Sequence, residues 1–197
     1  MHGHSLDLFI QLVQAHRVLG YVVLFIAMIF EGEAFLVVAG ILTTIKAFDV
    51  ADVWVIAFVG IVLGNVLWYS LGTKIENTRF AKRAIGWGKG IIIFVFPKFK
   101  EKPFKSIFFS KFIYGANRAT VVMSGVMGVP FRLFFKAEFL ASVLWVTLYL
   151  GIGYFFGYAA LSLTRNLSRL IFIVAVFVIS FILIQKAIAY YYEQPKK

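Results

Sequence analysis

The sequence predicts an all-α integral membrane protein, a polytopic helical bundle with two opposed re-entrant hairpins in an inverted repeat. Hydrophobic residues make up 61% of its 197 residues, whereas an ordinary soluble domain is about half apolar. Several apolar stretches reach the length that spans roughly 30 Å of hydrocarbon. Two of these stretches carry charged residues near their middle. A chain of this length fits one membrane bundle.

Five apolar stretches are long enough to cross a bilayer. The stretches 50–71, 131–161 and 169–192 have the composition of plain transmembrane helices. The stretches 19–45 and 107–129 contain charges, and broken backbone at membrane depth is tolerated where it is buried in protein or faces water. We therefore expect these two to be re-entrant hairpins. Two re-entrant hairpins place the N-terminus outside, whereas a single pass through 19–45 places it inside.

The chain is expected to begin with a helix that lies in the membrane interface. The apolar run 6–13 is too short to cross, and it lacks the basic region and cleavage site of a signal peptide. The expected bounds of this interfacial helix are 1–17. The membrane domain is expected at 18–161, with repeat halves 18–72 and 105–161 joined by a basic cytoplasmic segment, 73–104. A C-terminal transmembrane helix and basic tail are expected at 162–197.

The charges are unevenly distributed. There are 20 Lys and Arg against 9 Asp and Glu, and most of the bases lie in 73–105, whereas the turn at 48–52 is acidic. Cytoplasmic loops are enriched in Lys and Arg, so this segment and the tail at Lys196 and Lys197 are expected in the cytoplasm. The same pattern disfavours nucleic acid as a partner. Within the segment, 76–87 is either a helix in the headgroup layer or a solvated loop.

An internal repeat is visible at an offset of 85 residues, which carries Glu33 onto Arg118. Each copy reads as a charged residue, a half-length apolar helix, a glycine and a full-length helix that ends in Tyr-x-x-Gly. Repeats of this kind build the inverted folds of many transporters. The matched residues, with Gly32 as a point where the first hairpin unwinds, are the expected hairpin and structural positions: Gly32, Gly40, Gly125, Tyr69, Gly72, Tyr154 and Gly157.

Four charges within apolar stretches call for an explanation, because a charge at mid-bilayer costs about 2.5 kcal/mol or more. Glu31 and Glu33 lie in the first hairpin, and Lys111 and Arg118 lie in the second. The two bases are seven residues apart, so on one helix they would project from the same side. An acidic tip that faces a basic tip would neutralise both. These charges either form purely structural salt bridges or serve function.

The functional interpretation assigns the bases to an anion and the acids to protons. Arg118 would bind a lipid phosphate through its bidentate fork, with Lys111 as a point charge, and Glu31 and Glu33 would carry a proton. Glu138 shares a helical face with Ser142 and Trp145, and it either pairs with Lys111 or Arg118 or is a third protonatable group. Arg132 and Lys136 are expected to face cytoplasmic headgroups.

Enzymatic chemistry is disfavoured, and no cofactor or metal is expected. The histidines are His2, His4 and His16, all near the N-terminus, and the sequence has no cysteine. It also has no Gly-rich phosphate loop and no His-based metal motif.

Several motifs in order resemble the DedA family, also called the VTT or SNARE-associated Golgi protein family. An acidic re-entrant motif comes first, then a Gly-Asp-x-x-x-Tyr-x-x-Gly motif, then a basic stretch with a glycine and a final aromatic motif. The matching segments are 30–40 (FEGEAFLVVAG), 64–72 (GNVLWYSLG), 110–118 (SKFIYGANR) with Ser124, Gly125 and Met127, and Trp145 with 153–157 (GYFFG). At single positions the chain departs from the family, with Lys111 for an arginine, Asn117 where the arginine is usual, Asn65 for an acid and Glu138 for an amide.

The resemblance implies a membrane transporter in the cell inner membrane that returns undecaprenyl phosphate to the cytoplasmic leaflet, coupled to protons or sodium. It adds Asn117 to Arg118 and Lys111 as lipid-phosphate-binding residues. Eukaryotic relatives are implied to scramble phospholipids, so an energy-independent scramblase and a membrane-protein assembly factor without transport activity are the alternatives. The expected partners are membrane lipids, a polyisoprenyl phosphate or phospholipid, a proton or sodium ion and, as an open alternative, a second copy in a homodimer.

Overall fold

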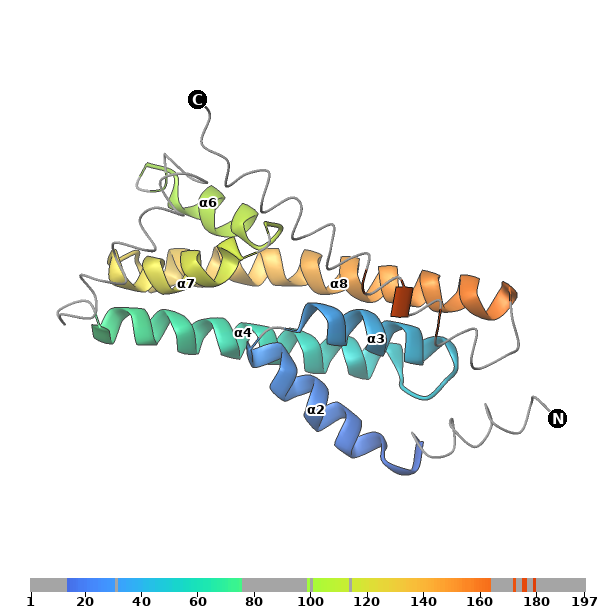
Figure 1. Ribbon diagram of the computed structural model, residues 1–197. Coiled ribbons are helices and arrows are strands. Elements are labelled where there is room, and N and C mark those ends of the chain that lie inside the picture. The colour runs from blue at the N-terminus through green and yellow to red at the C-terminus, as the bar shows by residue number, and fades with distance from the viewer. Residues whose placement is uncertain are drawn as a thin grey trace. The chain divides into compact units, whose positions relative to one another are not determined.

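Six α-helices form the part of the chain that the computed structural model describes, which is residues 14–30, 32–75, 99, 101–113, 115–163, 172, 175, 176 and 179. No strand occurs among these residues. The helices, shown in Figure 1, are α2 (Arg17–Phe30), α3 (Glu33–Thr44), α4 (Val50–Ile75), α6 (Pro103–Ser110), α7 (Ala116–Val126) and α8 (Phe131–Leu163). Glu31, the expected interfacial helix before residue 14, the segment 76–87 and nearly all of the C-terminal helix lie outside the described residues.

Two helices are long enough to cross a bilayer. α4 has 26 residues and α8 has 33, so at 1.5 Å per residue they are about 39 and 50 Å long. Both are strongly apolar over a window of span length. The predictions for 50–71 and 131–161 are therefore confirmed as apolar helices of membrane-spanning length, while the predicted helix at 169–192 lies almost wholly outside the described residues.

The two charged apolar stretches are each broken into a pair of short helices. The first pair, α2 and α3, meets next to Gly32, and the second pair, α6 and α7, is separated by 111–115. The four helices have 8 to 14 residues, which gives lengths of about 12 to 21 Å, less than the hydrocarbon core. No single one of them reaches across a membrane.

The second break overturns one expectation. Lys111 ends α6 as its C-cap residue, whereas Arg118 lies in the first turn of α7. The two bases therefore do not share a helix, and their seven-residue spacing does not set their direction. Gly115 makes the break, since its φ of 73° lies in the left-handed region that glycine adopts without strain.

The helices group into two compact units. Unit 1 contains the described residues up to Ile61 and from Val146 onward, and unit 2 contains those from Val62 to Trp145. Unit 1 thus combines α2, α3, the first half of α4 and the second half of α8. Unit 2 combines α6, α7 and the remaining halves of the two long helices. Each unit draws on both halves of the sequence repeat.

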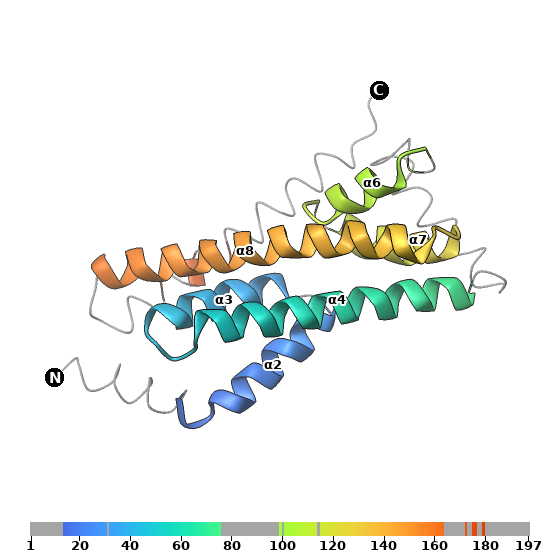
Figure 2. The ribbon, with the colours of Figure 1, turned by 180° about the vertical axis from the view of Figure 1, so that it is seen from behind.

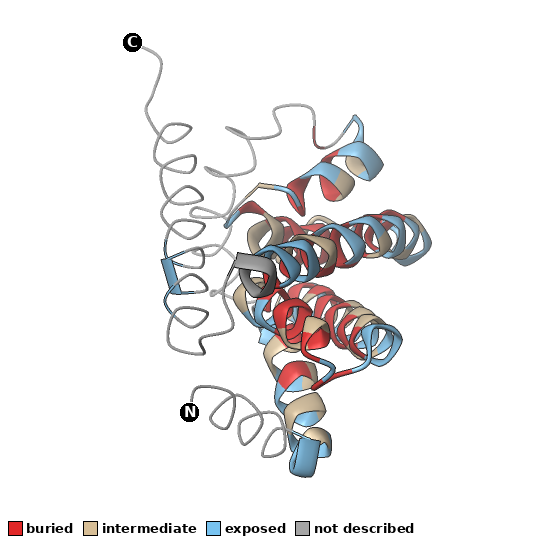
Figure 3. Cartoon of the chain, turned by 90° about the vertical axis from the view of Figure 1, so that its right-hand side faces the viewer, coloured by how far each residue is buried: buried red, intermediate tan, exposed pale blue. Residues whose placement is uncertain are grey.

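In unit 1 the start of α2 lies against the turn that follows α3 and against the first turn of α4. The guanidinium of Arg17 is 3.3 Å from the Asp52 carboxylate, and the Tyr21 hydroxyl donates to the same carboxylate at 3.0 Å. Gln14 donates to the carbonyl of Lys46 at 3.1 Å. The chain therefore enters and leaves the α2–α3 pair at the same end. α2 itself buries only Leu24 and Met28, and it is mostly pale blue and tan in Figure 3.

The second half of α8 packs closely on α3 in unit 1, as both ribbon views show (Figure 2). A Cβ on Gly40 would lie 2.7 Å from the Leu150 carbonyl oxygen and 3.1 Å from the Tyr154 nitrogen. A Cβ on Gly157 would lie 3.0 Å from the Cα of Ile41. Real Cβ atoms essentially never come within 3.0 Å of other atoms, so no side chain fits at Gly40 and the two helices meet there backbone to backbone.

Unit 2 repeats this contact between α7 and the second half of α4. A Cβ on Gly125 would lie 2.8 Å from the Thr73 nitrogen and would collide with the carbonyl oxygen of Tyr69. A Cβ on Gly72 would collide with the Val122 carbonyl. Around this contact lies a cluster of buried residues, made of Tyr69, Phe99, Ile107, Val121, Met123, Val126, Val129, Phe134 and Ala137.

Both long helices leave a stripe of large apolar side chains exposed. The stripe recurs every four residues, so its members fall on one slowly turning face. Its members are Val55, Val59, Leu63, Leu67 and Leu71 on α4 and Leu140, Leu144 and Leu148 on α8. A water-exposed face of this kind would aggregate, whereas it is suited to contact with lipid tails. Val55, Val59 and Leu63 precede the three α8 leucines by the repeat offset of 85 residues.

Candidate functional site

A buried ion pair lies in unit 2, between the end of α6 and α8. The ammonium of Lys111 is 2.6 Å from Oε2 of Glu138, and the two side chains are 1% and 2% exposed. The side-chain amide of Asn65, on α4, donates to the same oxygen at 2.8 Å. Three helices thus place one cation, one carboxylate and one amide in contact. Of the alternatives for Glu138, pairing with Lys111 is the one that the structure shows.

The Glu138 carboxylate is bonded asymmetrically. Oε2 accepts both Lys111 and Asn65, whereas Oε1 is buried and has no hydrogen-bond partner among the described residues. The hydroxyl of Ser142, one turn further along α8, is also buried without a hydrogen-bond partner in this part of the chain. Glu138, Ser142 and Trp145 are all at most 2% exposed, which confirms that they share a buried face of the helix.

Arg118 lies close to the same part of α4. Its guanidinium carbon is 4.8 Å from the centre of the Trp68 ring, a distance typical of a cation–π contact. Asn65 and Trp68 are three residues apart on α4 and are therefore neighbours on its surface. Because Lys111 reaches Glu138 at Asn65 while Arg118 lies over Trp68, the two bases are held at adjacent positions of one helix.

The start of α7 adds a second electrostatic feature. Its N-cap residue is Gly115, and no side chain of the described residues caps it. Backbone N–H groups and the helix dipole make such an end partly positive. Arg118 stands in this first turn beside Asn117, whose buried Oδ1 has no hydrogen-bond partner in the described part of the chain. A base at the positive end of a helix opposes the dipole, so the guanidinium and the helix end both contribute positive potential there.

The first acidic motif lies in unit 1. Glu33 begins α3, where a carboxylate is favoured by the helix dipole, and its side chain is partly buried. Gly32 is buried just before it, and a Cβ there would lie 2.9 Å from the Cα of Met28. Glu31 lies outside the described residues. The expected meeting of Glu33 with Arg118 stays a prediction.

Two of the expected structural tyrosines differ in their surroundings. Tyr69 is buried in unit 2, donates to the Val129 carbonyl at 2.6 Å and stacks on Phe134 with ring centres 4.3 Å apart. Tyr154, in unit 1, is 39% exposed. It lines an apolar pocket of about 420 Å³ together with Val50, Trp54, Thr147, Leu150 and Gly151.

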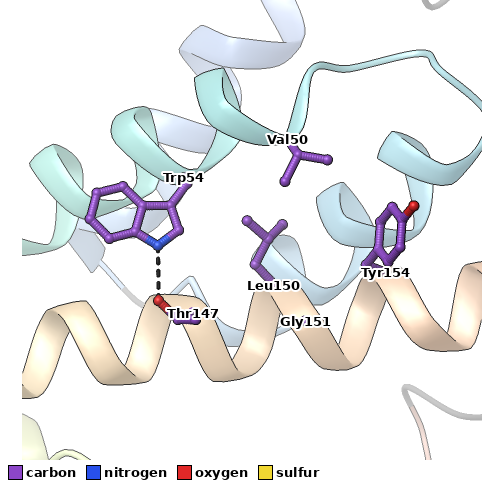
Figure 4. A pocket seen from close by; sticks show the side chains of 6 residues that line it. All are labelled: Val50, Trp54, Thr147, Leu150, Gly151 and Tyr154. Atoms are coloured by element: carbon purple, nitrogen blue, oxygen red, sulfur yellow. Dashed lines mark hydrogen bonds between the residues drawn. The ribbon is translucent and has the colours of Figure 1, made fainter.

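Figure 4 shows this pocket, with side chains that reach from α4 toward α8. The indole of Trp54 donates to the Thr147 hydroxyl at 3.0 Å, and the other lining side chains drawn are apolar except for the Tyr154 hydroxyl. None of the six described residues that line the pocket is charged. It is therefore suited to hydrocarbon and unsuited to a phosphate, which separates it from the bases of unit 2.

Sequence reasoning missed the roles of Asn65 and Trp68 in the site. Both lie in the second motif, where Asn65 stands out only as a departure from an acid. The available signal was an amide within an otherwise apolar helix, since such a group needs a partner in the membrane. Groups of three or more His, Cys, Asp or Glu residues that could hold a metal ion do not occur among the described residues.

Comparison with known proteins agrees with the motifs. A family model described as VTT domain matches residues 30–155. A search of curated proteins gave no match, and neither did a search of solved structures. The family match covers well over half of the chain and includes α3, α4, α6, α7 and most of α8. The chain therefore belongs to the VTT domain family of DedA and SNARE-associated Golgi proteins.

Proposed function

We propose that this membrane protein translocates a lipid phosphate carrier, undecaprenyl phosphate, between the leaflets of the cell inner membrane in a proton-coupled cycle. The VTT domain family is membrane-associated and is often linked to transport or flippase roles. The observation that carries the proposal is the pair of bases in unit 2, where Lys111 and Arg118 are held at neighbouring positions of the membrane-length helix α4.

A phosphate is the anion that this arrangement fits best. Arg118 supplies a planar fork of N–H donors that matches phosphate oxygens, and Lys111 supplies a point charge. The uncapped start of α7 adds backbone donors and the positive end of a helix dipole. Asn117 contributes an amide next to Arg118. Once Lys111 leaves Glu138, the two bases supply two positive charges for a phosphate monoester, which carries nearly two negative charges at pH 7.

The acids are assigned to the proton. Glu138 lies in direct contact with Lys111, and one of its oxygens is without a hydrogen-bond partner in the described part of the chain. Glu33 and Glu31 form the acidic motif at the start of α3 and just before it. Carboxylates that are shielded from water and adjacent to a site of variable charge are well suited to take up and release a proton during a transport cycle.

The membrane arrangement that we propose has two re-entrant hairpins, α2–α3 and α6–α7, in an inverted repeat. Three features support it. The short helices are shorter than the hydrocarbon core. The start of α2 contacts the first turn of α4 through Arg17 and Asp52, and Phe99 before α6 joins the same cluster as Val129 after α7. The glycine contacts support the repeat, because Gly40 meets the helix of Tyr154 as Gly125 meets that of Tyr69.

This topology is testable with single cysteines, since the natural chain has none. Gln14→Cys and Lys46→Cys would be labelled by an impermeant maleimide from the same, external side. Lys74→Cys would be labelled from the cytoplasmic side, together with a cysteine at the C-terminal tail. Labelling of Gln14→Cys and Lys46→Cys from opposite sides would mean that α2 and α3 cross the membrane once, and it would remove the hairpin from the proposal.

The transport function is tested in proteoliposomes. The purified protein is reconstituted with fluorescent undecaprenyl phosphate or fluorescent phosphatidylcholine, with and without a proton gradient, and the accessible fraction of each lipid is followed over time. We expect gradient-dependent movement of the phosphate carrier alone. Equal movement of both lipids without a gradient would indicate a scramblase instead, and no movement of either would favour an assembly factor.

Arg118→Ala is expected to abolish carrier movement, because it removes the fork from the phosphate site. Arg132→Ala is the matched control, since it removes the same charge from an exposed position in the same unit. Both variants should remain folded in the membrane. Wild-type carrier movement by a folded Arg118→Ala variant would contradict the proposed site.

A further inference from the structure

Lys111 cannot contact a lipid phosphate in the conformation that the structure shows. Its ammonium is bonded to Glu138 at 2.6 Å, and its side chain is 1% exposed. Any phosphate that binds Lys111 must first replace Glu138 as the partner of the ammonium. The two anions therefore compete for one cation.

We propose that Glu138 is an internal substitute for the phosphate, and that protonation of Glu138 hands Lys111 over to the lipid headgroup. The inference rests on the proposed function and gives it a coupling step. A proton from water on the loading side adds to the carboxylate, which becomes a neutral acid. Lys111 stays protonated and pairs with the phosphate. On release the acid returns its proton to water on the other side, and Lys111 pairs with Glu138 again.

The geometry of the carboxylate makes room for that proton. Oε2 already accepts Lys111 and Asn65, whereas Oε1 has no hydrogen-bond partner among the described residues. A proton on Oε1 removes the negative charge without displacing the Asn65 bond. The hydroxyl of Ser142, which has no hydrogen-bond partner among the described residues, lies one turn away on the same buried face, where one water would link it to the new O–H group.

The charge balance selects protonation over simple displacement. A Glu138 left ionised after Lys111 departs would be a buried charge without a partner, which is strongly unfavourable. Among the described residues, Lys111 at the end of α6 contacts Glu138 directly, while Arg118 on α7 lies over Trp68 and Tyr69 on α4 donates its hydroxyl to Val129. When Glu138 is neutral, Lys111 and Arg118 together balance a doubly charged phosphate.

Lys111 is also placed so that it can change partners. It caps the end of α6, directly before the break at 111–115, and is not held within a helix. Its four-carbon stem gives the ammonium a wide reach. Arg118 lies over the neighbouring position of α4 and would hold the phosphate while Lys111 moves.

The test measures binding of farnesyl phosphate to the detergent-purified full chain between pH 5.5 and 8, with farnesol as the uncharged control. Glu138→Gln is compared with the wild type at each pH, so the ionisation of the probe cancels in the ratio. We expect Glu138→Gln to bind between about 5-fold and 150-fold more tightly at pH 8, the range of ordinary coupling between sites, and the ratio to fall as the pH is lowered. Calorimetry in buffers of different ionisation enthalpy should show that Glu138→Gln takes up about one proton fewer on binding.

Glu138→Gln can lose stability, so a second variant keeps the inference falsifiable. Lys111→Met/Glu138→Met replaces the pair with apolar side chains, a change that folded proteins often tolerate. It should stay folded, bind the probe more weakly than the wild type and take up no extra proton. The inference is overturned if this variant binds with wild-type affinity and proton uptake, or if a folded Glu138→Gln shows the same affinity as the wild type at every pH. Wild-type protein that neither binds farnesyl phosphate nor moves the carrier would instead overturn the proposed function.

Discussion

Asn65 on α4 donates its side-chain amide to Glu138 on α8 across 2.8 Å. The bond joins the two positions at which the chain departs from its family in opposite senses, an amide where an acid is common and an acid where an amide is common. In this chain the two departures are in direct contact, which predicts that carboxylate and amide can exchange helices without loss of their hydrogen bond. Of the two residues 65 and 138, only one has to be a carboxylate to neutralise Lys111.

The exchange predicts the behaviour of a reversed pair. Glu138→Gln alone should destabilise the protein by about 3–5 kcal/mol, because it leaves Lys111 buried without a counter-charge. Asn65→Asp alone places a second carboxylate against Glu138 and should also destabilise it. Asn65→Asp/Glu138→Gln restores one acid, one amide and one base, and should unfold within about 1 kcal/mol of the wild type. Reversible unfolding in detergent, followed by circular dichroism, measures all four proteins. A double variant no more stable than Glu138→Gln would show that the carboxylate is needed on α8.

The glycine contacts predict that one methyl group is harmful at two positions. Gly40→Ala and Gly125→Ala should each cost about 1–3 kcal/mol through overpacking, because their Cβ atoms would collide with the backbone of α8 and α4 respectively. Gly151→Ala is the control, since a Cβ there meets no atom within 4 Å. It should be neutral or stabilise by up to about 1 kcal/mol through helix propensity. Unfolding midpoints in one detergent compare the three, and equal midpoints would remove the backbone contact as a source of stability.

The start of α2 is held by a hydroxyl more than by its ion pair. The Tyr21 hydroxyl accepts from Arg17 Nε at 3.0 Å and from the Asp49 backbone N–H at 3.2 Å, and it donates to Asp52 at 3.0 Å. Arg17 and Asp52 are 41% and 54% exposed, so their pair is worth about 0–1 kcal/mol. Tyr21→Phe should therefore destabilise the protein more than Arg17→Ala does. High salt should reduce the destabilisation caused by Arg17→Ala, which removes an ion pair, and should leave that caused by Tyr21→Phe unchanged. The reverse order of unfolding midpoints would contradict this account.

Much of the fold was predictable because membrane length and apolar composition are strong local signals. The spans at 50–71 and 131–161, the interruption at Gly32 and the buried face of Glu138 all follow from residue type and helical spacing. The shared helix for Lys111 and Arg118 was wrong because a seven-residue spacing is informative only while the helix is unbroken. Gly115 ends that continuity with a positive φ, and nothing in the spacing of the charges marks it.

The partners of the charges were less predictable, because contact between helices is not encoded in spacing along one helix. The sequence allowed Glu138 to pair with either Lys111 or Arg118, and in the structure it pairs with Lys111. The sequence repeat also does not show that each short helix packs on the long helix of the other half. The short helix α3 of the first half packs on α8 of the second half through Gly40, and α7 packs on α4 through Gly125. Each compact unit consequently mixes the two halves, whereas the repeat alone suggests that each half folds by itself.

The contact between Arg118 and Trp68 predicts that an aromatic ring sets phosphate affinity without touching the phosphate. The guanidinium lies 4.8 Å from the ring centre, and such contacts contribute about 0.5–2 kcal/mol. Trp68→Leu should therefore weaken farnesyl phosphate binding by between about 2-fold and 30-fold, and Trp68→Phe, which keeps a smaller π-face, should fall between Trp68→Leu and the wild type. Trp54→Leu is the control, because Trp54 lies in the apolar pocket of unit 1 and bonds to Thr147. Since Arg118 keeps its charge in every variant, the loss should appear as a graded change in affinity that follows the ring. Equal affinity in Trp68→Leu and the wild type would mean that the guanidinium is oriented by other contacts, and an equal loss in Trp54→Leu would point to a general weakening of the fold.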